Sequence, residues 1–169
     1  KPTYTGMIKS FKNDLRLDLT DNYENIDRFS LESPSLEEIQ SFRSLISLSL
    51  EFSESYRITD ERLWHLSCES FPYFQSLTNL YLNISWFLSI SSKEFENFLS
   101  DGIGTLQSLT NLRININLQT PISDKGLLSL GKGIKKLKML VGLSLSFEQC
   151  FTITNQGLKN LSCEGIQFL

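Results

Sequence analysis

Two stretches of the chain decide its fold: QSLTNLYLNI at residues 75–84 and QSLTNLRINI at residues 107–116. They agree at eight of ten positions and lie 32 residues apart. The same apolar pattern recurs one period earlier and, after a single-residue deletion near Lys132, one period later. The four matching sets are Leu45, Leu48, Leu50 and Phe52; Leu77, Leu80, Leu82 and Ile84; Leu109, Leu112, Ile114 and Ile116; and Leu140, Leu143, Leu145 and Phe147. A degenerate copy at Leu15, Leu17 and Leu19 brings the predicted number of strands to five.

A second apolar set recurs between the strands with spacings of three and four, which are typical of a helix. Its members are Ile58, Leu63, Leu66, Phe71 and Phe74; Ile90, Phe95, Phe98, Ile103 and Leu106; Ile122, Leu127, Leu130, Ile134 and Leu137; and Ile153, Leu158, Leu161, Ile166 and Leu169. Hydroxyl residues precede each predicted helix at the N-cap position: Thr59, Ser91, Ser123 and Thr154. Ser91 with Glu94 also matches a capping box. Each repeat is therefore predicted to be a strand followed by a helix.

This register resembles the leucine-rich repeat proteins of the ribonuclease-inhibitor-like kind over about residues 11–169. The unit here is L-x-x-L-x-L-x-[IF] followed by I-[ST]-x-x-x-[LF]-x-x-[LF]. The Asn or Cys that usually follows the strand in that family is not apparent. The resemblance implies a curved α/β solenoid with a parallel sheet on the concave side and helices on the convex side. We expect one domain over residues 1–169, with repeats starting near 12, 45, 77, 109 and 140.

Stacking also follows from physics, because one strand–helix unit cannot bury its apolar face alone. The alternate strand residues then point outward and form the candidate binding face. They are Arg16 and Asp18; Ser49 and Glu51; Tyr81 and Asn83; Arg113 and Asn115; and Ser144 and Ser146. Polar alternation on a half-exposed strand also serves solubility alone. Tyr81, Arg113 and Glu51 are the most suggestive of partner binding, because Tyr and Arg are common interface anchors.

Composition restricts the classes of function. The chain has a formal net charge of -3 and a pI near 5.2, which disfavours general nucleic-acid binding because phosphate contacts need a basic face. The sequence contains no run of 18 apolar residues, which is the pattern that would predict a membrane-spanning helix. Lys132, Lys135, Lys136 and Lys138 form a basic cluster that we interpret as a solvated helix face.

We predict that the protein is not an enzyme and needs no cofactor or metal. GLLSLGKG at residues 126–133 nearly matches a phosphate-binding loop, but Gly133 replaces the required hydroxyl residue and the segment falls on a predicted helix. DGIG at residues 101–104 is predicted to be a helix-to-strand connection. His65 is the one histidine, and the helical phase predicts that it faces solvent without the partners that catalysis requires.

The cysteines and glycosylation sequons bear on the compartment. Cys68 and Cys163 occupy equivalent positions three repeats apart and are too distant to pair, whereas a bond between Cys150 and Cys163 is conceivable. We favour three reduced, mostly buried thiols and a cytoplasmic location. The alternative is an extracellular protein with glycans at Asn83 and Asn160.

The predicted function is non-catalytic protein binding through the concave sheet, with Glu51, Tyr81, Asn83, Arg113, Asn115, Ser144 and Ser146 as the candidate partner-binding residues. The alternative is a structural subunit of a larger assembly or fibre, which contacts partners through its ends and helix face. Leu169 stands three residues before an expected sixth strand, so we expect the C-terminal end to be covered by further repeats of a longer chain or by another subunit.

Overall fold

The computed structural model of the chain describes residues 14–18, 36–53, 59–85, 90–117 and 122–168. These residues contain a five-stranded sheet in which every neighbouring pair of strands is parallel and the strands follow chain order. The strands are β1 (Asp14–Asp18), β2 (Ser47–Ser53), β3 (Asn79–Ser85), β4 (Asn111–Asn117) and β5 (Gly142–Glu148). The predicted α/β class and parallel sheet are confirmed.

The sheet register follows the sequence repeat. Leu48 pairs with Leu80, and Leu80 pairs with Leu112, at a spacing of 32 residues in both cases. Leu112 pairs with Leu143 at a spacing of 31, because the fourth repeat is one residue shorter. Leu15 pairs with Leu48 at a spacing of 33. Residues at equivalent positions of the sequence repeat are thus paired with each other on neighbouring strands.

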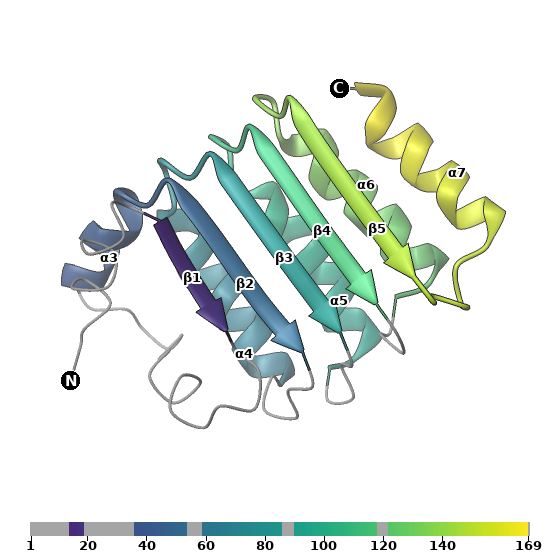
Figure 1. Ribbon diagram of the computed structural model, residues 1–169, viewed down its shortest axis with the longest axis horizontal. Helices are drawn as coiled ribbons and strands as arrows, with labels where there is room; N and C mark the ends of the chain where they lie inside the picture. The colour runs from purple at the N-terminus through teal and green to yellow at the C-terminus, as the bar shows by residue number, and fades with distance from the viewer. Residues whose placement is uncertain (1–13, 19–35, 54–58, 86–89, 118–121, 169) are drawn as a thin grey trace.

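Helical segments follow each strand of the sheet. They are α3 (Leu36–Arg43), α4 (Asp60–His65), η1 (Leu66–Ser70), η2 (Phe71–Tyr73), α5 (Ser92–Asn97), η3 (Phe98–Gly102), α6 (Asp124–Lys136), α7 (Asn155–Glu164) and η4 (Ile166–Phe168). Helices α4, α5 and α6 lie behind the sheet in Figure 1, and α7 lies beside α6 at the end of the row. The described part of the chain is therefore a sheet covered by helices on one face.

The core lies between these two layers. Inward strand residues such as Leu50, Leu82 and Ile114 are fully buried, and they share one apolar cluster with helix residues such as Leu63 and Leu127. The predicted apolar positions from residue 45 to residue 140 are buried wherever the structure describes them. Ile58 and Leu169 lie outside the described residues. The inward and outward alternation predicted for β2, β3 and β4 is thus confirmed.

The helices of two units contain a π-helical turn. The N–H of Phe71 donates to the carbonyl of Leu66, and the N–H of Ile103 donates to that of Phe98, five residues earlier in each case. In α6 the corresponding inward residues, Leu130 and Ile134, are only four residues apart. A π-turn holds one more residue than an α-turn. The π-turn therefore accommodates the one extra residue of the 32-residue repeats, which the shorter repeat that contains α6 lacks.

The DGIG segment is helical rather than a connection, so the prediction for residues 101–104 is wrong. Asp101 and Gly102 belong to η3 and the helical trace continues through Gly104. A Cβ on Gly102 would lie 2.6 Å from the Cβ of Ser67 in the preceding helix, which is closer than two such atoms approach. Gly102 is therefore required by close helix packing, and not by a turn.

The predicted N-caps are confirmed in position, but not all form the expected hydrogen bond. Side chains of Thr59, Ser91 and Thr154 accept backbone N–H groups of their own helices, whereas Ser123 forms no such bond. Ser91 accepts from the N–H of Glu94 at 3.2 Å, which is half of a capping box. The N–H of Ser91 itself donates to Oδ1 of Asp60, in the preceding helix, at 2.6 Å.

Asp124 makes the same link at the next pair of helices. Its carboxylate accepts the backbone N–H of Thr154 at 2.8 Å and the Thr154 hydroxyl at 2.5 Å. The hydrogen bond from the Thr154 hydroxyl contributes most, and the bond from its backbone N–H adds to it; together they hold the pKa of Asp124 below its ordinary value. Asp60 and Asp124 thus tie the start of one helix to the start of the next.

The C-terminal end is less buried than predicted. Leu158 is 47% exposed and Ile166 is 41% exposed, although the equivalent Leu127 and Ile134 of α6 are 0% exposed. Leu143, Leu145 and Phe147 of β5 are half-buried. The reason is that α7 and β5 have a neighbouring unit on one side only among the described residues.

Candidate functional site

The candidate site is the face of the sheet opposite α4, α5 and α6, which we call the strand face and define by the outward side chains of β2–β5. The register arranges the predicted residues in two rows across the strands. One row contains Ser49, Tyr81, Arg113 and Ser144, and the next contains Glu51, Asn83, Asn115 and Ser146. Arg113 and Ser144 are exposed, and the other six side chains are half-buried. Arg16 and Asp18 extend these rows on β1, but their side chains lie outside what the structure describes.

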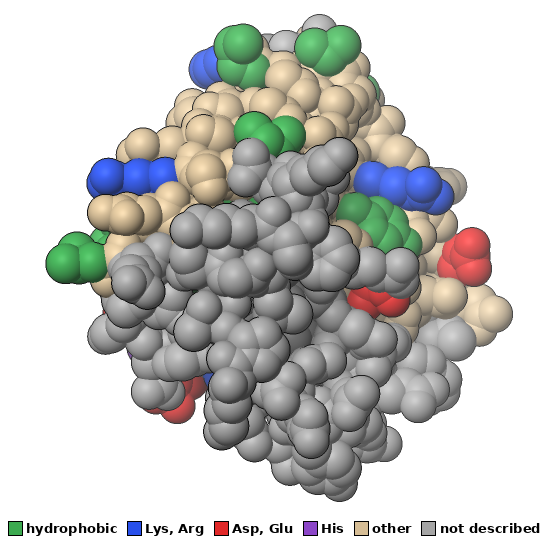
Figure 2. Space-filling view, turned by 60° about the vertical axis from the view of Figure 1, so that its left-hand side comes forward, with side chains coloured by type: hydrophobic (Ala, Val, Ile, Leu, Met, Phe, Trp, Pro, Cys, Tyr) green, Lys and Arg blue, Asp and Glu red, His purple; other side chains and the backbone are tan. Residues whose placement is uncertain are grey.

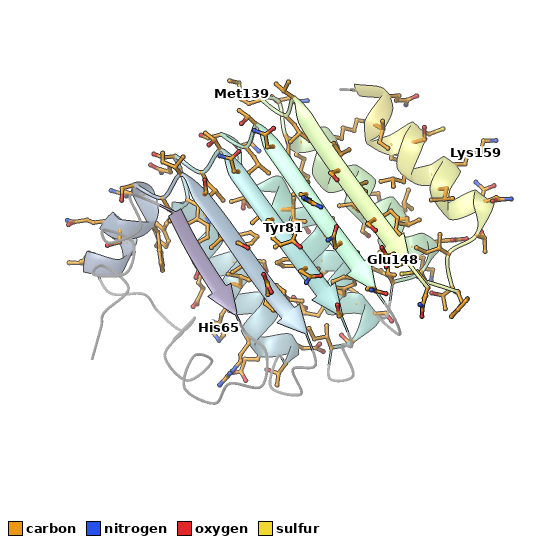
Figure 3. All side chains as sticks on the ribbon, in the orientation of Figure 1. His65, Tyr81, Met139, Glu148 and Lys159 are labelled. Carbon is orange, nitrogen blue, oxygen red and sulfur yellow. The ribbon has the colours of Figure 1, made fainter. Side chains whose placement is uncertain are left out.

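Three of these side chains contact one another near the middle of the sheet. The guanidinium carbon of Arg113 lies 5.5 Å from the ring centroid of Tyr81, which is within cation–π range. The Asn115 side chain donates to the Tyr81 hydroxyl oxygen at 3.2 Å. Tyr81 lies centrally on the sheet in Figure 3. The structure thus brings Tyr81 together with Arg113, as adjacent strands predict, and adds Asn115 as the residue that holds the phenol group.

Glu51 does not join this cluster. Its row partner is Asn83, and β3 separates its strand from Arg113. With strands about 4.8 Å apart and a rise of about 3.3 Å per residue, the Cα atoms of Glu51 and Arg113 are about 12 Å apart. Glu51 therefore remains a separate candidate residue on the strand face, apart from the contact of Tyr81 with Arg113.

A ladder of side-chain amides at the start of the strands escaped the sequence analysis. The Asn111 side chain donates to Oδ1 of Asn79 at 3.0 Å, and the Asn79 side chain donates to the Ser47 hydroxyl at 3.3 Å. The ladder ends at Gly142, where a Cβ would lie 2.3 Å from Oδ1 of Asn111. The repeated Thr-Asn pairs at residues 78–79 and 110–111 are the sequence signal. This row is structural, because its amides bond to each other.

His65 is less accessible than the helical phase predicted. Its side chain is 15% exposed, and its Nδ1 lies 2.8 Å from Oε2 of Glu69. The ring also packs edge-on against Trp64, with centroids 5.0 Å apart. His65 lies at the lower end of the sheet in Figure 3, away from Tyr81. The pair sits at the junction of α4 and η1 and makes a local i, i+4 contact.

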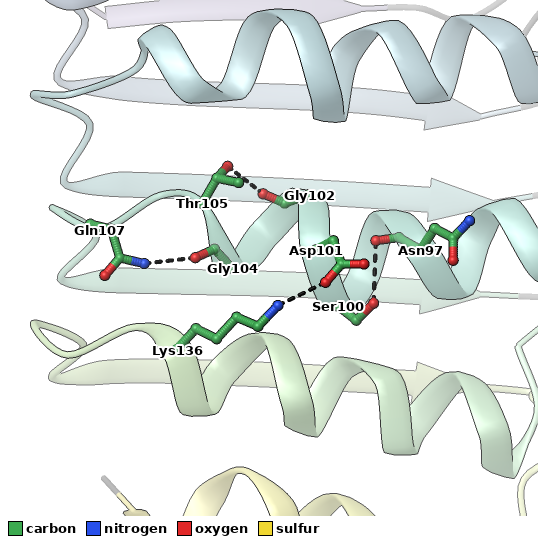
Figure 4. Close-up of polar contacts among 8 residues, drawn as sticks. All are labelled: Asn97, Ser100, Asp101, Gly102, Gly104, Thr105, Gln107 and Lys136. Carbon is green, nitrogen blue, oxygen red and sulfur yellow. Dashed lines mark hydrogen bonds and ion pairs between the residues drawn. The ribbon is translucent and has the colours of Figure 1, made fainter.

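The lysine cluster in and just after α6 lies on the helix side. The four lysine residues are exposed and line a hollow of about 780 Å³ together with Ser100, Asp101, Gly104, Gln107 and Glu164. Lys136 and Asp101 form an ion pair (Figure 4), with Nζ 2.7 Å from Oδ1. The ammonium of Lys138 donates to the backbone carbonyl of Lys135 at 3.2 Å. The prediction of a solvated helix face agrees with this exposure. Cations at the C-terminal end of α6 also interact favourably with the negative end of the helix dipole.

None of the three cysteines forms a disulfide in the structure, but their predicted burial is wrong. Cys68 and Cys163 are exposed and only Cys150 is half-buried. The helix positions beside them explain this difference: Ser67 is buried next to Cys68, and Leu161 is buried two residues before Cys163. Each exposed thiol therefore lies on the solvent side of its helix.

The segment GLLSLGKG lies within α6, as predicted, and its Leu127 and Leu130 are fully buried. Across the described ranges, no group of three or more His, Cys, Asp and Glu side chains is placed to hold a metal ion. None of the described helices has the length and apolar character needed to cross a membrane.

Comparison with known proteins assigns no function to the strand face, so we interpret it from its own residues. The sequence matches no protein-family model, and a search of curated proteins finds no significant match.

Proposed function

We propose that this chain is a leucine-rich-repeat solenoid of the ribonuclease-inhibitor-like kind, and that it works as a non-catalytic module whose strand face binds a protein partner. Support for the fold comes from the parallel register of β1–β5, which repeats every 31–33 residues, and from a helical segment after each of β1–β5. A sheet buried on one face by helices is rigid, which suits recognition by its other face.

The contact of Tyr81 with Arg113 and Asn115 is the observation that carries the proposed binding function. Tyr and Arg are enriched among the residues that dominate interface energetics. Here both are anchored on adjacent strands, so little side-chain entropy is lost when a partner binds. The surrounding Asn83, Ser144 and Ser146 offer hydrogen bonds without a fixed charge.

Affinity capture from the native source, followed by calorimetry with the purified partner, tests this function. Tyr81→Ala should weaken binding by at least about 30-fold, which corresponds to the roughly 2 kcal/mol of an interface hot spot. Lys159→Ala is the matched control, because Lys159 is exposed on α7 and away from the strand face (Figure 3). A partner that binds both variants as well as the wild type would contradict binding through the strand face.

A second candidate function, assembly through the C-terminal end, is favoured by a separate observation. The carbonyls of Ile46, Thr78 and Thr110 each accept two N–H groups from the start of the following strand. Val141 is the next residue in this series, and no described N–H donates to its carbonyl. Apolar side chains are also exposed near this end: Met139 at 59%, Val141 at 88%, Phe151 at 90%, Leu158 at 47% and Ile166 at 41%.

These groups form the surface that another strand–helix unit would cover, since each earlier unit covers its predecessor in this way. On the opposite side of the molecule, the described hydrophobic side chains in Figure 2 are scattered among polar ones. Hydroxyl-radical footprinting of Val141, Leu158 and Ile166 in the native particle and in the isolated chain tests the assembly. Protection in the particle supports it, with Trp64 of α4 as the control. Equal labelling in both samples would contradict it.

A further inference from the structure

The guanidinium of Arg113 is an exposed cation on the strand face, and it has no anionic partner among the described residues. Its described contact is the Tyr81 ring, 5.5 Å from the guanidinium carbon to the centroid. One aromatic ring does not occupy all five N–H donors of a guanidinium, so donors remain for other partners. Arg113 is therefore oriented without being neutralised.

The Tyr81 ring, which the Arg113 guanidinium contacts, is held at two points. Arg113 and Tyr81 are directly paired on β4 and β3, and Asn115, two residues further along β4, donates to the Tyr81 hydroxyl at 3.2 Å. The ring is thus anchored by the strand backbone at one end and by a hydrogen bond at the other. A preoriented fork of donors loses less side-chain entropy on binding than a free arginine.

The described carboxylates of the strand face are too distant to balance this charge. Glu51 is two strands away, at about 12 Å between Cα atoms, and Glu148 is one strand and four residues away, at about 14 Å. Neither carboxylate forms an ion pair with Arg113 in the structure. The other described side chains of this face are uncharged Ser, Asn and Tyr residues, so Arg113 dominates the local potential.

We infer that the partner presents an aspartate or glutamate side chain to Arg113, on a peptide segment that contacts the strand face beside Tyr81 and Ser144. The inference rests on the proposed binding function of the strand face. A guanidinium edge matches a carboxylate with two parallel N–H···O bonds. One cation balances the single charge of a carboxylate, whereas phosphate recognition typically uses a cluster of arginines.

The neighbours of Arg113 complete the subsite. Ser144 pairs with Arg113 across β4 and β5 and is exposed, so its hydroxyl is available to the same acid or to the adjoining peptide group. Tyr81 is half-buried and leaves part of its ring for the apolar stem of the acidic side chain. The class of partner is therefore an acidic peptide segment.

Selection of binders from a random 12-residue peptide library on the full chain tests this inference. We expect enrichment of peptides with an Asp or Glu that cannot be replaced by Asn or Gln without a loss of about 10- to 100-fold in affinity, the range for a charge-assisted hydrogen bond. Arg113→Lys should lose most of the affinity, because an ammonium cannot make the paired bonds. Lys159→Ala should bind as the wild type does, and circular dichroism should give the same spectrum for all variants.

The outcomes separate the inference from the proposed function. Peptides that lose affinity with Tyr81→Ala but tolerate Arg113→Ala and loss of their acid would overturn the carboxylate inference and leave strand-face binding standing. Binders that depend on a phosphoserine in place of the acid would also overturn it. A selection whose binders are all insensitive to Tyr81→Ala and Arg113→Ala, or that yields none, would contradict the proposed function as well.

Discussion

The backbone N–H of Phe71 donates to the carbonyl of Leu66, five residues earlier, so this turn holds one more residue than an α-turn. Both side chains remain buried, at 1% exposure each. The π-turn is thus the device by which a 32-residue repeat keeps the same inward residues as the 31-residue repeat that contains α6.

Deletion of one residue should therefore destabilise the two kinds of helix to different extents. Removal of the exposed Cys68 from η1 should cost less than about 1 kcal/mol, because Leu66 and Phe71 would then be spaced as in an ordinary α-turn. Removal of the exposed Lys132 from α6 should cost about 2–5 kcal/mol, because Ile134 would rotate out of the core. Urea denaturation measures both. Equal losses would mean that the π-turn is not a one-residue insertion.

Two adjacent residues of β4 should differ sharply in their effect on stability. Leu112→Asp places an unpaired charge at a position that is 1% exposed, and we expect it to unfold the chain at a cost of several kcal/mol. Arg113→Ala should cost no more than about 1 kcal/mol, the value of an exposed cation–π contact. Thermal melts report both changes. A folded Leu112→Asp protein with an unchanged Tm would refute the strand phase.

Glycine substitutions test how closely the helices approach. A Cβ on Gly133 would lie 2.1 Å from the backbone oxygen of Leu99, which cannot move without shifting η3. Gly133→Ala should therefore lower the free energy of unfolding by about 1–3 kcal/mol. Gly104→Ala is the matched control, because its nearest obstacle is the flexible Lys136 side chain at 2.6 Å. A neutral Gly133→Ala variant in a chemical melt would contradict the close approach of α6 to η3.

The hydrogen bonds between Asp124 and Thr154 predict that the stability of the fold depends on pH. Because hydrogen bonds from Thr154 lower the pKa of Asp124 in the folded state, the carboxylate adds stability above its ordinary pKa of 3.8. That stability is lost as the pH falls through the lowered value. Wild type should therefore exceed Asp124→Asn in Tm at pH 7, and the difference should vanish in strong acid. A difference that is constant from pH 7 to pH 2 would exclude titration of this link.

The sequence alone determined the strand register and the division of strand residues into inward and outward sets. Both depend on a period of two within each strand and on a repeat of 31–33 residues, and these periodicities decide which side chains meet the core regardless of atomic detail. For this reason, Leu80, Leu112 and Arg113 were placed correctly, and the two rows of the candidate site could be predicted by residue number.

Only the tertiary structure decided which side chains touch between units. The contact of Asn115 with Tyr81, the caps from Asp60 and Asp124, and the π-turns depend on side-chain length, rotamer and helix spacing, for which a repeat pattern carries no signal. The exposure of Leu158 has the same origin. Its position in the repeat is a core position, but an apolar side chain is buried only where a neighbouring unit lies against it, and α7 has a described neighbour on one side alone.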